Sequence, residues 1–184
     1  MSDKVTIQVS DPMKIQRLRD RIAEDIARKY IHKFFMQNSN YSITKDDRQI
    51  EVSLEVINPI EDLMALFRRT KVKGWWEKYR EGLLKVVKAV ADMSVTPDLA
   101  LILQTFVWKG TFPDWEECRC DVALVEVKRG QARLGYYQNK DVKKARKEGM
   151  PYYLLRVDDS DFLHGKFALT LEQLTPEAVL SVPK

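Results

Sequence analysis

The chain has 184 residues, a length that predicts one domain of ordinary size with at most a small appendage. Apolar residues make up 45% of it and charged residues 32%, which is enough for a sizeable core beneath a well-solvated surface. Its net charge of +4 permits a polyanionic partner without requiring one.

The pattern of the chain argues against four classes of protein. Two cysteines in a Cys-x-Cys, with no second pair and no nearby histidine, form neither a disulfide scaffold nor a zinc quartet. The first ten residues lack the basic and apolar regions of a signal peptide. No apolar run approaches the ~18–20 residues that cross a bilayer. We therefore expect a soluble, cytoplasmic protein without a membrane partner.

The first part of the chain predicts mainly helix. An Asp-Pro pair opens residues 11–37, where apolar residues recur at steps of three and four, so we expect a long amphipathic helix. Residues 49–57 alternate polar and apolar side chains and predict a strand, and a short helix is expected over 59–69. Residues 1–73 are interpreted as a mainly helical N-terminal extension with one or two strands.

The second part, residues 74–184, is interpreted as the functional core. The expected order is helix 74–92, strand 96–103, hairpin connection 104–117, strand 120–129, helix 136–148, strand 152–157 and a short helix or cap in the tail. The hairpin makes the first two strands antiparallel, and the helical crossover makes the last two parallel. The fold class expected is α/β, with a mixed central sheet flanked by helices.

Three charged residues meet in this predicted arrangement. Glu126 and Lys128 share one face at the end of the most strand-like segment, and Asp98 opens the antiparallel neighbour, so all three are expected at one edge of the sheet. Two carboxylates held together repel unless a cation lies between them, and such oxygen ligands suit Mg²⁺ or Mn²⁺. The ammonium of Lys128 can orient an attacking water or offset charge on a phosphoryl group.

The sequence Thr-Pro-Asp at 96–98, followed by Val-Glu-Val-Lys at 125–128, resembles the PD-(D/E)XK nuclease superfamily. This is the restriction-endonuclease-like fold, which includes the Holliday-junction resolvases. The resemblance covers residues 95–157 and implies that Asp98 and Glu126 bind the metal while Lys128 assists the water.

The same resemblance implies further features of a metal-dependent deoxyribonuclease. In that family a helix after the ExK strand often carries a Gln that contacts the site or the DNA, and Gln138 matches this position. Many members add a Glu on a helix preceding the sheet. Glu77, Glu81 and Glu24 are the candidates here, and we take Glu81. Because nucleases of this fold often act as dimers, a homodimer is a further expectation.

The aspartate assignment has two rivals. Asp114 also follows a proline and lies only twelve residues before Glu126, but no turn signal separates it from the ExK strand. Asp98 is followed by the strand-like sequence LALIL, so we favour it. Asp121 is a third carboxylate, which strand parity places on the face opposite Glu126.

Basic residues gather next to this predicted site. Eight Lys and Arg residues, against Asp141 alone, lie between positions 128 and 147, as expected of a surface that neutralises phosphates. Tyr136 and Tyr137 either stack on bases or pack in the core. The residues expected to contact DNA are Arg129, Arg133, Lys140, Lys143, Lys144 and Lys147.

The leading interpretation is therefore a Mg²⁺-dependent nuclease that hydrolyses phosphodiester bonds in DNA. One alternative is a catalytically silent DNA-binding module on the same fold. Another is an assembly protein in which Glu126 and Lys128 only form an ion pair at a sheet edge. The last interpretation predicts no metal binding.

Overall fold

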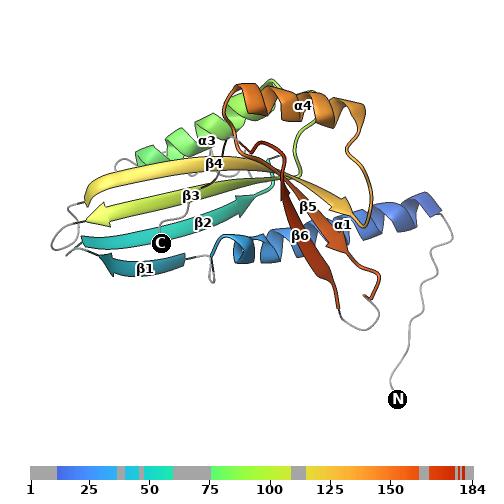
Figure 1. Ribbon diagram of the computed structural model, residues 1–184, viewed down its shortest axis with the longest axis horizontal. Coiled ribbons are helices and arrows are strands. Elements are labelled where there is room, and N and C mark those ends of the chain that lie inside the picture. The colour runs from blue at the N-terminus through green and yellow to red at the C-terminus, as the bar shows by residue number, and fades with distance from the viewer. Residues whose placement is uncertain are drawn as a thin grey trace, which may run out of the picture.

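The computed structural model describes residues 12–36, 40–45, 48–59, 76–108, 115–161, 166–176, 178 and 180. These residues form a mixed α/β fold, in which three α-helices pack on a six-stranded sheet of order β1-β2-β3-β4-β5-β6 (Figure 1). The helices are α1 (Pro12–Tyr30), α3 (Trp76–Ala91) and α4 (Tyr136–Lys147), and a 3₁₀ turn, Ile31–Phe34, extends α1. The strands are β1 (Asn40–Lys45), β2 (Arg48–Ile57), β3 (Leu99–Trp108), β4 (Trp115–Arg129), β5 (Tyr152–Asp158) and β6 (Ala168–Gln173).

The sheet is mixed because one of its connections is a helical crossover. The chain passes from β4 through α4 to β5, which pairs parallel to β4, and the other neighbours pair antiparallel. Strong twist turns β5 and β6 steeply away from the direction of β1–β4 (Figure 1). β1 and β2, from the segment interpreted as an N-terminal extension, belong to this same sheet.

Each face of the sheet has its own apolar core, and β4 contributes to both. Its residues 123, 125 and 127 pack in the cluster that includes the inner side of α1, and its residues 122 and 124 pack with α3 and α4. This alternation follows from the strand period of two residues. The residues from α1 are Ala23 and Ala27, and those from α3 and α4 are Leu83, Val86, Ala89 and Ala145.

Several sequence predictions are confirmed. The long first helix forms, although its last turn tightens to 3₁₀ geometry after Tyr30. The strand predicted over 49–57 is β2, and the antiparallel and parallel pairings around β4 are those expected. The segment that follows β6 is hydrogen-bonded to β5: Thr175 Oγ accepts the N–H of Tyr152 at 2.8 Å, and the N–H of Leu180 donates to the hydroxyl of Tyr153 at 3.0 Å.

Other predictions need correction. The connection expected over 104–117 is shorter, because β3 continues to Trp108 and β4 begins at Trp115, where the two tryptophans pair across the ladder. β6 was not expected, and β1, the second of the one or two strands expected in residues 1–73, had been given no position. Both are short outer strands, and the residues of β6 are all exposed or half-buried, so they lack the apolar pattern of an inner strand. The helix expected over 59–69 and the boundary at residue 73 lie outside the described residues.

Within the part of the chain that the structure describes, none of the helices is both long enough and apolar enough to span a bilayer.

Candidate functional site

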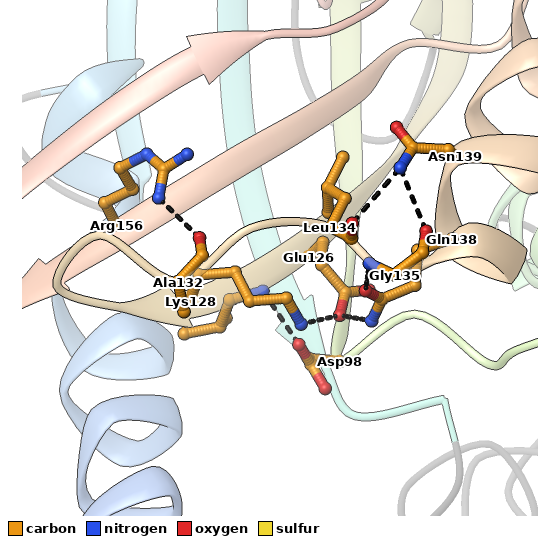
Figure 2. A network of polar contacts seen from close by, with 10 residues as sticks. Asp98, Glu126, Lys128, Ala132, Leu134, Gly135, Gln138, Asn139 and Arg156 are labelled. Atoms are coloured by element: carbon orange, nitrogen blue, oxygen red, sulfur yellow. Dashed lines mark hydrogen bonds and ion pairs between the residues drawn. The ribbon is translucent and has the colours of Figure 1, made fainter.

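The ends of β3 and β4 bring Asp98 and Glu126 together. Leu99 pairs with Val125 in the antiparallel ladder, so Asp98, one residue before β3, lies level with Glu126 and Val127. Its Oδ2 accepts the backbone N–H of Val127 at 2.7 Å (Figure 2). The sequence prediction that these two carboxylates share one edge therefore agrees with the geometry.

Lys128 and Gln138 reach the Glu126 carboxylate from opposite sides (Figure 2). The Nζ of Lys128 donates to Oε1 of Glu126 at 2.5 Å, and the side-chain amide of Gln138 donates to the same oxygen. The carbonyl of that amide accepts the N–H of Gly135 at 2.8 Å, which fixes its orientation. Gln138 thus joins the first turn of α4 to the carboxylate. The buried Oε2 of Glu126 receives no hydrogen bond.

Burial gives this pair of acids unusual titration behaviour. Glu126 is only 2% exposed, and burial, followed by the charge of Asp98, raises its pKa to about 7, although Lys128 acts in the opposite direction. Burial also raises the pKa of Asp98, against the N–H of Val127 and the charge of Lys128. Two such acids ionise together only when positive charge offsets their repulsion.

The carboxylate pair fits a hard divalent cation. Mg²⁺ is commonly held by one or two carboxylates, with water or phosphate oxygens completing its shell. The repulsion between Asp98 and Glu126 and the unpartnered Oε2 of Glu126 are both features that a cation would relieve. Among the described residues, no group of three or more His, Cys, Asp or Glu side chains is placed to hold a metal, so these two acids are the ligands the site offers.

A cavity of about 280 Å³ lies between α1 and this edge of the sheet. Asp98 and Lys128 line it from the sheet side, and Gln16, Asp20 and Glu24 line it from α1. The three α1 residues are spaced by four and therefore share one face of the helix. The helix that places a Glu in this cavity is α1.

Glu81, which we took as the fourth carboxylate, is not brought to this site. The neighbouring residue Gly82 packs against Cys120 of β4. Cys120 lies about 20 Å along the strand from Glu126, at roughly 3.3 Å per residue. Glu24 instead lines the cavity beside Asp98. The spacing of Gln16, Asp20 and Glu24 on one flank of an amphipathic helix was the sequence signal that favoured it.

Three other acidic residues were candidates in the sequence analysis. Asp114 and the side chain of Glu77 lie outside the described residues. Trp115, which follows Asp114, is about 36 Å along β4 from Glu126, at roughly 3.3 Å per residue. Asp121 forms an ion pair with Arg119 at 2.7 Å, on the face of β4 opposite Glu126, as strand parity predicted.

The buried Asp141 is a site residue that the sequence prediction missed. It is 2% exposed, and its two oxygens accept the N–H groups of Ser94 and Val95 at 2.8 and 2.9 Å. Those residues lead directly to Asp98. Because Gln138 and Asp141 are three residues apart, one face of α4 holds both Glu126 and the segment that carries Asp98. The sequence signal for Asp141 was that it is the single acidic residue in a basic helix.

The predicted DNA-contacting residues divide into two groups. Arg133, Lys140, Lys143 and Lys147 are exposed. Lys144 donates to the backbone carbonyl of Asp92 at 2.8 Å and helps to hold the end of α3, and Arg129 donates to Gln16 of α1 at 3.1 Å. Lys144 and Arg129 are thus engaged in hydrogen bonds within the protein.

We predict that Asp141→Asn destabilises the protein by about 1–3 kcal/mol, because the amide replaces one acceptor oxygen and leaves a backbone N–H without its partner. The free energy of unfolding in urea measures this loss. Asp121→Asn is the matched control, since its half-exposed ion pair is worth ~0–1 kcal/mol. Equal effects of the two substitutions would contradict the role given to Asp141.

We predict that the metal-free protein loses stability relative to Glu126→Gln as the pH rises. The raised pKa means that the native state favours the protonated acid, so its stabilising contribution is complete below 4.5 and is lost as the pH passes through about 7. Urea unfolding of both proteins in chelator, well below and well above that range, gives the difference. A difference that does not change with pH would refute this account of Glu126.

Comparisons with known proteins assign no family. No family model matches the chain, and neither the curated proteins nor the solved structures contain a significant match. The resemblance to PD-(D/E)XK nucleases therefore rests on the sequence motifs that carry it.

Proposed function

We propose that this protein is a metal-dependent nuclease that hydrolyses phosphodiester bonds in DNA, with a restriction-endonuclease-like fold. The observation that carries the proposal is the meeting of Asp98, Glu126 and Lys128 at one end of β3 and β4. The topology is in keeping with it: the ExK strand β4 pairs antiparallel with β3, the strand that Asp98 precedes, and is followed by a helix and then by a strand parallel to it.

Each residue of the site has a distinct task in this reaction. Asp98 and Glu126 would hold Mg²⁺ or Mn²⁺, which when bound lowers the pKa of water and polarises a phosphate oxygen. Lys128, released from its ion pair once a cation faces Glu126, would orient the water and offset the charge that develops on the phosphoryl group. Gln138 is a positioning residue, since its amide holds Glu126 in place.

Glu24 extends the acidic side of the site. It lines the same cavity as Asp98 and Lys128 and comes from α1, a different element. We assign to it the role of a further carboxylate that orients metal-bound water, in place of Glu81.

The DNA backbone would lie along the outer side of α4. The exposed Arg133, Lys140, Lys143 and Lys147 follow the ExK strand directly, and α4 also carries Gln138 into the site. Contacts to phosphates made by such residues give affinity without reading sequence. A homodimer stays a prediction of the family resemblance.

The proposal is tested by cleavage of labelled duplex, single-stranded and four-way-junction DNA with Mg²⁺ or Mn²⁺. We expect Asp98→Asn, Glu126→Gln and Lys128→Met each to reduce cleavage by about 10²-fold or more, because each removes a group that acts on the metal or on the developing charge. Asp121→Asn, on the opposite face of β4, is the matched control and keeps its activity.

Three further results would decide between the alternatives. Loss of cleavage with Asp114→Asn but not with Asp98→Asn would transfer the metal-binding role to the rival aspartate. A greater loss with Glu24→Gln than with Glu81→Gln supports the assignment of the α1 carboxylate. DNA binding without cleavage, together with no metal binding by calorimetry, would refute the nuclease and favour a silent binding module.

We predict that neutralising Lys140, Lys143 and Lys147 together weakens DNA binding and lowers the slope of log affinity against log salt concentration by about 2–3, since each phosphate contact contributes ~0.9 in duplex DNA. Fluorescence anisotropy over a salt series measures the slope. The control replaces the exposed Lys29, Lys88 and Lys166, which lie on other elements and carry the same total charge. Identical slopes for both triple variants would exclude α4 as the phosphate-binding surface.

A further inference from the structure

Two tyrosines stand exposed at the start of α4, beside the candidate site. Tyr136 is 79% exposed and Tyr137 is 59% exposed, whereas Tyr152 and Tyr153 of β5 are only 1% and 4% exposed. Burying a tyrosine ring stabilises a fold, and large rings at the surface are commonly kept for binding. The structure thus excludes the core-packing alternative for Tyr136 and Tyr137.

Hydrogen bonds hold the backbone around the exposed tyrosines. The side chain of Asn139 donates to the carbonyls of Leu134 and Gly135 at 3.1 and 3.0 Å, and the N–H of Gly135 donates to Gln138 (Figure 2). The backbone on both sides of the tyrosines is therefore fixed. The two rings contact each other edge to face, with centroids 5.3 Å apart and planes at 79°. Rigid aromatic rings bind a flat partner at a small cost in conformational entropy.

The position of the pair relates it directly to the chemistry. Tyr137 precedes Gln138, whose amide contacts Glu126, and consecutive residues of a helix point about 100° apart. Gln138 therefore points to the sheet while the tyrosines point to solvent. The first turn of α4 contains no acidic residue, and the exposed Arg133 and Lys140 lie three residues to either side of the tyrosines in the sequence. This combination of rings and positive charge fits a partner in which a flat group is attached to a phosphate chain.

We propose that Tyr136 and Tyr137 form a stacking platform for an unpaired base of single-stranded DNA next to the phosphate that is cleaved. This inference rests on the proposed function and names its substrate class, DNA with a single-stranded segment at the site. Bases in a duplex are stacked on one another and present no free face, whereas an unpaired base stacks on an aromatic side chain without regard to sequence.

The test uses single-stranded oligonucleotides that contain 2-aminopurine, whose fluorescence falls when it stacks. The protein is present with chelator, so that no cleavage is needed for the signal. We expect the parent protein to quench this fluorescence, and Tyr136→Leu/Tyr137→Leu to abolish the quenching and weaken single-strand binding about tenfold or more. Tyr136→Phe/Tyr137→Phe, which keeps both rings, should behave as the parent.

The outcomes separate this inference from the nuclease proposal. Quenching that depends on the two rings, without cleavage of any DNA, would support the stacking platform and refute the nuclease proposal. Cleavage by a parent protein that quenches no 2-aminopurine would leave the nuclease and refute the platform. Equal quenching by the parent and the doubly substituted Leu variant would also refute it. Because both side chains are exposed, matching thermal unfolding of the variants confirms that each is folded.

Discussion

The register of β3 on β4 is the constraint on which the candidate site depends. With Leu99 opposite Val125, Asp98 binds the N–H of Val127 and its carboxylate lies beside that of Glu126. A slip of one residue along β4 would turn Glu126 toward the α1 face and away from Gln138. The apolar core on the α1 face opposes such a slip, because it would have to receive the Glu126 carboxylate in the place of Val125 or Val127.

The buried acids at this edge of the sheet are costly to ionise. Glu126 is buried beside the half-buried Asp98, and the charge of Asp98 opposes the ionisation of Glu126. Lys128 and Gln138 offset part of this cost through contacts to one oxygen of Glu126, and its second oxygen receives no hydrogen bond. Apolar residues in these positions would be cheaper to bury. Buried charged residues in an otherwise apolar part of a sheet are the kind of exception that is expected at functional sites.

The fold was predictable from the sequence where local patterns are strong. The period of α1, the alternation of β2 and the strand-helix-strand succession from β4 to β5 all follow from side-chain spacing. β1 and β6 were not located because short outer strands bury little and so carry a weak pattern. The hairpin between β3 and β4 was expected to be longer than it is, because cross-strand partners extended both strands beyond their apolar segments.

The sequence by itself determined which residue types occupy the site. Strand parity places Glu126 and Lys128 on one face, and Pro-Asp before an apolar run places Asp98 at the start of the neighbouring strand. Only the tertiary structure decided that α1 lines the cavity with a glutamate, that Asp141 holds the segment leading to Asp98, and that the tyrosines of α4 face solvent. The physical reason is that local spacing specifies which side chains share a face of one element, whereas packing between elements decides what that face meets.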